Sequence, residues 1–299
     1  MSVVWLGYVF AIVSSLFSAI YVIPKKLSGQ KPITYAMIMG IGYFVASTAG
    51  FLFLKTFKYI EEPLFFHHVW LACLNGIVWM IASVSVLSSI DRIGLAKSNQ
   101  WKGLQGPIGA FLMLAFLSEF LTAKVVFIIL AIVFITFAAM MFSIRGKNDA
   151  SINRSGIVYA LISALFFGVS ALIWKILTNE GIFFAQQVFQ SLFIIISAAA
   201  YSLFKNKSLK IDASNVKKEF ILPLIGGVLF FGDATFNLLA NNYIEGSIAF
   251  MLHQLNAIWL LLLGVFLFKE IDFRKHWLRL IAGLISSIIG IFMLVIAKV

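Results

Sequence analysis

Residues 7–17 read Gly7-Tyr-Val-Phe-Ala-Ile-Val-Ser-Ser-Leu-Phe17, and 149 positions later residues 156–166 read Gly156-Ile-Val-Tyr-Ala-Leu-Ile-Ser-Ala-Leu-Phe166. The same offset joins Lys26 to Lys175, and an offset of 151 joins the pairs Gly76/Gly227 and Glu119/Glu270. Apolar sequences match easily by chance, so the paired Gly, Ser, Lys and Glu residues matter most. They predict an internal repeat, with residues 1–146 as the first copy and residues 155–299 as the second.

The composition excludes most soluble classes of protein. Of the 299 residues, 62% are hydrophobic and 12% are charged, and the mean hydropathy is +1.01. Soluble domains are about half apolar and about one quarter charged, and disordered chains are more polar still. The single cysteine, Cys73, excludes an intrachain disulfide framework. No metal site is expected, because Cys/His clusters are absent, and no cofactor is expected, because no phosphate-binding or dinucleotide-binding motif occurs.

The apolar residues gather into runs long enough to cross a membrane. A spanning helix needs about 20 mainly apolar residues, and the runs are continuous rather than alternating, which argues against a β-barrel. Ten segments qualify: Val3–Ile23, Ile33–Leu54, Val69–Ile90, Leu95–Leu117, Val125–Ile144, Ile157–Ile176, Phe183–Leu203, Phe220–Asn241, Ser247–Phe268 and Trp277–Ala297. The sequence therefore predicts an all-α membrane protein with ten transmembrane helices.

The number of spans in each half fixes how the two halves are related. Five is odd, so the second copy enters the membrane from the opposite face, which gives an inverted repeat. Such a repeat is typical of carriers whose central site opens to each side in turn. We therefore expect a secondary transporter that is embedded in the lipid bilayer and works by alternating access.

The basic residues predict the orientation. Of the 23 Lys and Arg, 18 lie in the odd-numbered connections, and 5 lie in the even-numbered connections and the C-terminus. The positive-inside rule places the odd connections in the cytoplasm and both termini outside it, in the cell membrane. The net charge of +11 is thus attributed to membrane flanks, and no nucleic-acid partner is expected.

One carboxylate stands near the middle of a predicted span. Asp233 lies thirteen residues into the eighth span, near the bilayer midplane at ~1.5 Å per residue. An ionised carboxylate in hydrocarbon is costly, so Asp233 should face the bundle interior or carry a proton. Asn237 and Asn241 continue the same helix face. We interpret Asp233 as the proton-coupling residue; the alternative is a structural carboxyl that is hydrogen-bonded between helices.

Amides and indoles supply candidate solute-binding groups. Amides can both donate to and accept from sugar hydroxyls, and indoles suit the apolar faces of sugar rings. Gly106-Pro107 is expected to kink the fourth span. The alternative role is interhelical amide contact, worth about 0.6–2 kcal/mol. The candidates are His253, Gln254, Asn256 and Trp259 in the ninth span, Trp101 and Gln105 in the fourth, Asn237, Trp79 and Gln186.

Several short motifs are similar to those of one transporter family. They are Ser28-Gly29-Gln30-Lys31-Pro32, Ile93-Gly94…Lys97…Gly103-Leu104-Gln105, Gly246…Ala249-Phe250…Gln254-Leu255…Gly264…Glu270…Lys275 and Gln186-Gln187. With them the chain resembles the glucose/ribose porter (sugar uptake) family of the drug/metabolite transporter superfamily. The resemblance implies ten spans in two five-span repeats and proton-linked uptake of a monosaccharide.

The sequence therefore predicts proton-coupled uptake of a monosaccharide or similar small polar metabolite. Ser98–Lys102, His253 and Trp259 differ from the family pattern, which leaves other polar solutes open. The alternative is a metabolite or drug exporter of the same superfamily. An intramembrane enzyme would need a converging nucleophile, acid and base. Since His253 alone among the four histidines lies in a predicted span, we do not expect an enzyme.

Overall fold

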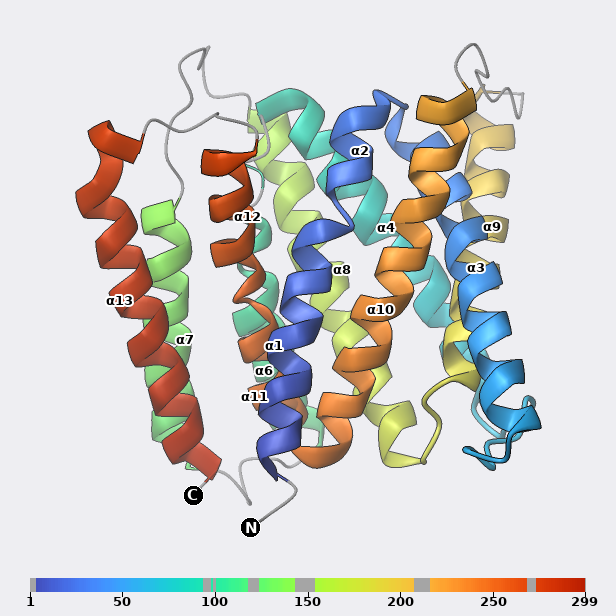
Figure 1. Cartoon of the computed structure of the whole chain (residues 1–299), viewed down its shortest axis with the longest axis horizontal. Coiled ribbons are helices and arrows are strands. Elements are labelled where there is room, and N and C mark those ends of the chain that lie inside the picture. Colours follow the sequence, from blue (N-terminus) through green and yellow to red (C-terminus); the bar gives the residue numbers. More distant parts are fainter. Residues whose placement is uncertain are drawn as a thin grey trace.

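The computed structural model describes residues 4–93, 98, 101–117, 124–142, 154–206, 216–267 and 273–298. Most of these residues are helical, with no strand among them, and the long helices stand side by side with both termini at one end (Figure 1). They are α1 (Val4–Ile20), α2 (Ile23–Ser28), α3 (Pro32–Thr56), α4 (Val69–Ile93), α6 (Gln105–Leu117), α7 (Val125–Phe142), α8 (Arg154–Asn179), α9 (Ala185–Asn206), η2 (Lys217–Ile221), α10 (Leu222–Tyr243), α11 (Gly246–His253), α12 (Asn256–Phe266) and α13 (Phe273–Lys298).

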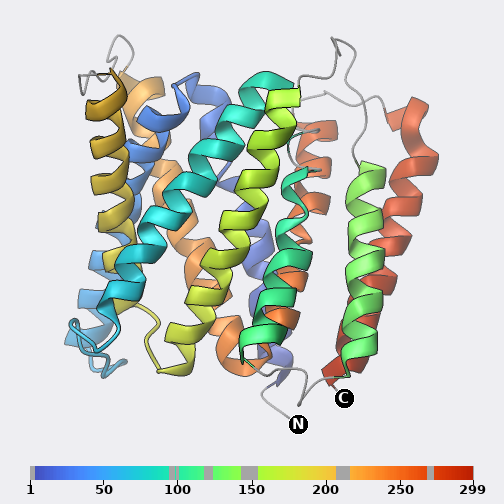
Figure 2. The same ribbon diagram turned by 180° about the vertical axis from the view of Figure 1, so that it is seen from behind.

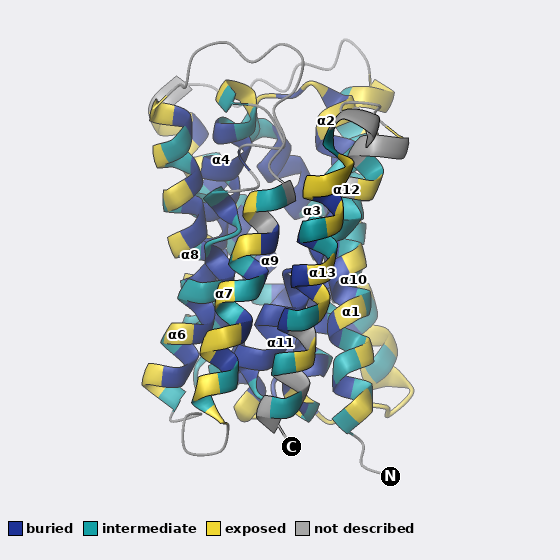
Figure 3. Cartoon of the chain, turned by 90° about the vertical axis from the view of Figure 1, so that its left-hand side faces the viewer, coloured by how far each residue is buried: buried dark blue, intermediate teal, exposed yellow. Residues whose placement is uncertain are grey.

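Many of these helices have the length and composition of membrane spans. Six are long and apolar enough: Val4–Ser28, Pro32–Thr56, Val69–Ile93, Arg154–Asn179, Ala185–Phe204 and Lys217–Tyr243. Gln105–Leu117, Val125–Ala138 and His276–Gly290 are shorter apolar helices. Burial follows the inner faces of the helices, and exposed residues lie along the outer faces (Figure 3). Large apolar side chains such as Phe53, Phe111 and Phe292 are among the exposed ones, as expected for a surface in contact with lipid.

Glycines allow two helix pairs to pack backbone against backbone. A Cβ added at Gly227 of α10 would overlap the carbonyl oxygen of Met39 on α3. A Cβ added at Gly76 of α4 would overlap the carbonyl oxygen of Gln190 on α9. Small residues at helix contacts permit this close approach in membranes. Figure 2 shows the other face of the molecule, where α4 lies beside α8 and α7 beside α13.

Two predicted spans differ from the continuous helices expected from the sequence. In the segment expected at Leu95–Leu117, a turn at Gly103–Leu104 precedes α6, and Gly106 N–H bonds to the Gly103 carbonyl at 3.2 Å. Pro107 favours this break, because it has no N–H to offer the same carbonyl. In the segment expected at Ser247–Phe268, Gln254 and Leu255 form a turn between α11 and α12. Glu119 and Glu270 lie outside the described residues.

Candidate functional site

Asp233 lies in a buried junction of three helices. Its Oδ1 accepts a hydrogen bond from Ser14 Oγ of α1 at 2.7 Å and lies 2.9 Å from Nε2 of His253, the last residue of α11. Asp233 is 2% exposed and His253 is 7% exposed. A carboxylate and an imidazole in contact can share a proton, because the imidazole carries one or two N–H groups. The structure thus brings together two residues that the sequence assigned to separate roles.

One ring nitrogen of His253 forms no hydrogen bond within the described structure. Its Nδ1 is buried and has no hydrogen-bond partner in the described part of the chain. The ring stacks on Phe250 with a centroid distance of 6.0 Å and an interplanar angle of 6°. The ring is therefore fixed in orientation, and Nδ1 remains available to a solute or water.

Serine hydroxyls of α1 accept hydrogen bonds from polar side chains of α12. Nδ2 of Asn256 donates to Ser18 Oγ at 3.1 Å, and Nε1 of Trp259 donates to Ser15 Oγ at 2.9 Å. Ser14 donates to Asp233, so three serines of α1 together form hydrogen bonds with the predicted site residues Asp233, Asn256 and Trp259. Sequence reasoning missed these serines as site residues, although Ser14 and Ser18 lie four residues apart on one helix face.

Two glutamines join the two helix breaks. Nε2 of Gln105, the first residue of α6, donates to Oε1 of Gln254 at 3.2 Å. Gln254 in turn donates its Nε2 to the carbonyl of Phe250 at 3.1 Å. Oε1 of Gln105 is buried and has no partner among the described residues. A small cavity beside the pair is lined by Lys102, Gly103, Gln105, Ile135, Ala138, Gln254, Leu255, Asn256, Ala257 and Ser287.

The remaining amide candidates lie in different places. Asn237 is buried on α10, where its Oδ1 accepts from Asn241 at 3.2 Å and its Nδ2 has no partner in the described structure. Gln186 lies at the start of α9 and donates to the carbonyl of Ile182. Gln190, four residues further along α9, accepts a 2.7 Å hydrogen bond from the indole of Trp174. Within the described residues, no hydrogen bond joins Gln186 to the group around Asp233.

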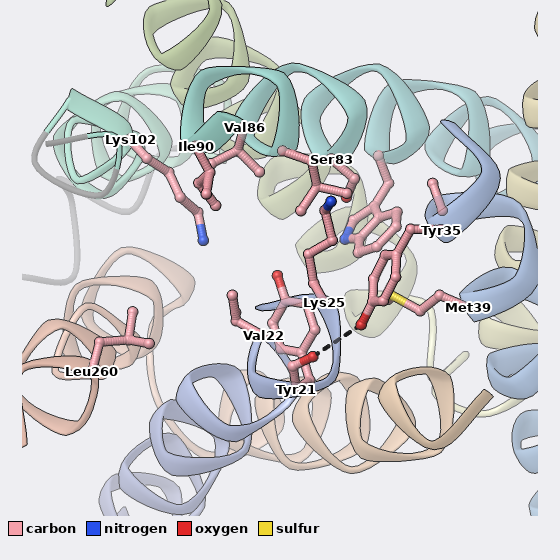
Figure 4. A pocket seen from close by; sticks show the side chains of 13 residues that line it. Tyr21, Val22, Lys25, Tyr35, Met39, Ser83, Val86, Ile90, Lys102 and Leu260 are labelled. Atoms are coloured by element: carbon pink, nitrogen blue, oxygen red, sulfur yellow. Dashed lines mark hydrogen bonds between the residues drawn. The ribbon is translucent and has the colours of Figure 1, made fainter. Parts of the chain in front are cut away.

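An aromatic pocket opens between α1, α2, α3 and α4 (Figure 4). Trp79 is 2% exposed and lines its wall, 4.5 Å from Phe230 between ring centroids. Two lysines that the sequence analysis did not assign to the site line the pocket too. The lining residues are Tyr21, Val22, Lys25, Tyr35, Ala36, Met39, Trp79, Ser83, Val86, Leu87, Ile90, Lys102 and Leu260. Trp101 is half-buried next to Lys102 in the sequence.

The two pocket lysines have different surroundings. Nζ of Lys25 donates to the carbonyl of Gln30 at 2.5 Å and lies 3.7 Å from the Asp91 carboxylate. Nζ of Lys102 lies 5.0 Å from the ring centroid of Phe167. Figure 4 shows the Lys102 side chain extending toward the gap that the pocket residues surround. The pocket volume is about 30 Å³, which is room for water but not for a sugar.

A second hollow lies at the opposite end of the molecule, close to the N-terminal end of α1 (Figure 1). It is polar, with a volume of about 400 Å³, and is lined by Leu117, Lys175, Thr178, Asn179, Asn241, Asn242, Tyr243, Ile244 and Glu245. Nζ of Lys175 donates to the carbonyl of Asn241 at 2.6 Å and so binds the C-terminal end of α10. The small aromatic pocket and the larger polar hollow therefore lie toward opposite ends of the helices.

The comparisons with known proteins agree with the predicted class. Residues 102–297 match the family described as sugar transport protein. The probable glucose uptake protein GlcU of Priestia megaterium is 22% identical, with 96% of this chain and 98% of the relative covered. The glucose uptake protein GlcU of Bacillus subtilis (strain 168) is 20% identical, with coverages of 96% and 97%.

The fold also occurs among solved structures. A crystal structure described without a function superposes with a TM-score of 0.72 at 12% identity, covering 98% of this chain and 97% of that one. At 12% identity the match shows that the fold is shared and carries no information about function. The helices, the family and the full-length relatives together make this chain a multi-pass membrane protein and a transporter rather than an enzyme, as the sequence predicted. The family match extends over most of the chain, which belongs to the sugar transport protein family.

Proposed function

We propose that the chain is a secondary carrier that takes up a monosaccharide or similar small polar solute together with a proton. The buried pair of Asp233 and His253 carries this proposal. With the proton bound, carboxylate and imidazolium sum to zero charge; without it, the pair has a charge of −1. Since moving an unpaired charge through the hydrocarbon region is expensive, the charge of this pair, summed with the other buried charges, can decide when the carrier changes its conformation. The relatives named glucose uptake proteins support a sugar as the solute.

The helix contacts support ten spans arranged as an inverted repeat. We propose that α1, α3, α4, α6 and α7 correspond to α8, α9, α10, α11–α12 and α13. If each helix is replaced by its proposed counterpart, the contact between α4 and α8 becomes a contact between α10 and α1. In the same way, the contact between α3 and α10 becomes a contact between α9 and α4. All four contacts occur in the structure. The proposed units are therefore residues 1–146 and residues 155–299.

The openings at the two ends support alternating access. The aromatic pocket lies toward α2, and the polar hollow lies toward the termini (Figure 1). We propose that the α2 end faces the cytoplasm, because the connections at that end hold most of the basic residues. Both termini would then be extracytoplasmic. The aromatic pocket is too small for a sugar in this conformation, so it would accept the solute after the helices move apart.

We propose that solute hydroxyls bind near the helix breaks. Oε1 of Gln105, Nδ2 of Asn237 and Nδ1 of His253 are buried polar atoms without partners in the described structure, so each gains from a hydroxyl partner. Gln254 and Asn256 are proposed to complete the hydroxyl contacts, and Trp79, Trp101 and Trp259 to supply the ring contacts. Gln186 lies apart from these groups at the start of α9, and we propose it as a secondary contact on the solute path.

The proposal is tested with purified protein in liposomes. Accumulation of the transported solute, with glucose as the first one tested, should follow an imposed inward proton gradient. Asp233→Asn should abolish gradient-driven accumulation while sparing glucose exchange, because exchange needs no net proton movement. Glu61→Gln is the matched control, since Glu61 is an exposed loop carboxylate. Full accumulation by the Asp233→Asn variant would remove Asp233 from the mechanism. Rescue of a host that lacks sugar uptake separates an importer from an exporter.

A further inference from the structure

Lys102 is a buried cation that no described carboxylate neutralises directly. It is 6% exposed and lines the aromatic pocket. The described structure places the ring of Phe167 near its Nζ, but no carboxylate at ion-pair distance. Lys25 differs, because Asp91 lies 3.7 Å from its Nζ. An unpaired ammonium in a membrane protein interior is expensive. Lys102 therefore indicates that a negative charge is present beside it in some states of the carrier and absent in others.

The other charged or titratable groups around the pocket limit where that charge comes from. Asp233 interacts electrostatically with Lys102 and also with the hydroxyls of Tyr21 and Tyr43. Tyrosines are neutral near pH 7, and Lys25 is balanced by Asp91. Among the described groups, the buried Asp233–His253 pair is thus the acid–base pair whose charge acts on Lys102.

Charge balance then distinguishes two neutral states of the carrier. In the empty state, Lys102 is positive and Asp233 is negative, with His253 neutral, so the charges sum to zero. When His253 and Asp233 share an added proton, that pair is neutral and Lys102 is left as a net positive charge. One bound anion restores neutrality. A proton without the anion, or the anion without a proton, leaves a net charge in the membrane interior, which opposes the conformational change.

We propose that the solute is a monoanionic sugar acid, such as a uronate or aldonate, which moves with one proton in an electroneutral step. This inference rests on the proposed proton-coupled uptake and names its substrate class. Lys102 binds the carboxylate of the solute by a charge-assisted hydrogen bond. Trp79 provides an aromatic face for the sugar, and the hydroxyls of Tyr21 and Ser83 line the same pocket for the sugar hydroxyls (Figure 4).

The experiment measures uptake of radiolabelled glucuronate and of glucose by the full-length protein in liposomes. An inward proton gradient is imposed, and the membrane potential is set separately with potassium and valinomycin. We expect the gradient to drive glucuronate accumulation, and an inside-negative potential to leave its initial rate within about twofold. Proton-coupled movement of a neutral sugar carries net charge, so the same potential would accelerate it.

Variants of Lys102 test the role of the cation. Lys102→Gln should reduce glucuronate uptake by about tenfold or more, since the amide cannot form the charge-assisted hydrogen bond to the carboxylate. Lys102→Arg should retain part of the activity. Lys124→Gln, which removes an exposed lysine, should have no effect. Monodispersity and the melting temperature of each purified variant separate loss of transport from loss of folding.

The other outcomes overturn the inference in distinguishable ways. Gradient-driven glucose uptake without glucuronate uptake or competition would leave proton-coupled sugar transport intact and refute the sugar acid. Glucuronate uptake that accelerates with an inside-negative potential would refute the electroneutral step. Equal glucuronate uptake by wild type and a folded Lys102→Gln variant would refute the role of Lys102. Absence of uptake for both solutes would refute this inference and the proposed function together.

Discussion

Gln105 donates its Nε2 hydrogen to Oε1 of Gln254 at 3.2 Å, and these residues are 149 positions apart in the sequence. The same offset separates Gly7–Phe17 from its copy at Gly156–Phe166. Each glutamine lies at a helix interruption. Gln105 is the first residue of α6, directly after the turn, and Gln254 lies in the turn between α11 and α12. One amide contact thus links the two helix breaks directly.

The Gln105–Gln254 contact should show strong coupling in a double-mutant cycle. Gln105→Leu or Gln254→Leu leaves a buried amide without its partner, which costs about 1–3 kcal/mol. The double variant should be destabilised by less than the sum of the two single variants, because it buries no orphaned amide. Thermal unfolding in detergent measures all four proteins. Strict additivity would mean that the two amides do not interact.

Gly76 and Gly227 should be intolerant of alanine. A Cβ at either position overlaps a backbone carbonyl of the neighbouring helix, which cannot move away as a side chain can. Overpacking of this kind costs about 1–3 kcal/mol or more. Gly40→Ala is the control, because its nearest neighbours are side-chain atoms of Ile194 and Ile195 at 3.0 Å. Equal melting temperatures for Gly40→Ala and Gly227→Ala would contradict the backbone contact.

Glu62 should make the stability depend on pH. Its Oε2 accepts from the N–H groups of Phe184 at 2.8 Å and Ala185 at 3.0 Å, at the start of α9. Burial raises the pKa of Glu62 above its ordinary value of 4.5, against the opposing effects of these amides and of Lys55. The folded state therefore holds a proton to higher pH than the unfolded state, and the free energy of unfolding falls as the pH rises above 4.5.

Glu62→Gln removes this titration while keeping an acceptor for the helix start. The variant should lose the corresponding part of the pH dependence, measured as melting temperature between pH 4.5 and pH 7. Glu62→Ala should lose about 1 kcal/mol at both ends of this range, since the N–H groups of α9 lose their acceptor. An unchanged pH profile in Glu62→Gln would assign the titration to another group.

Trp79 should affect solute affinity more than proton coupling. Replacing it with Phe keeps an aromatic ring in the wall but reduces the face offered to the solute, at a cost of about 0.5–1.5 kcal/mol. The expected result is a rise in the KM for uptake of about two- to tenfold with an unchanged dependence on the proton gradient. Trp70→Phe, an exposed tryptophan of the same helix, is the control. A similar KM in both variants would exclude Trp79 from the solute site.

The sequence alone predicted the class of protein because the signals are local and strong. Continuous apolar runs require helices in lipid, where every backbone N–H and C=O must be satisfied within the segment. Asp233 was identifiable for the same reason, since a carboxylate inside such a run needs a special environment. The family motifs predicted sugar transport, and the comparisons confirm that family.

Only the tertiary structure decided which groups meet. Ser14, Asp233 and His253 lie on three helices, with Ser14 219 residues from Asp233, and no spacing rule along one helix joins them. Lys102 sits at the start of a predicted span, where it resembles a membrane-flanking lysine until the fold shows it buried in the aromatic pocket. Hydropathy determined where the helices run, because the bilayer acts on each segment separately. The packing of helices against one another determined the site, because contacts between distant segments depend on all of them at once.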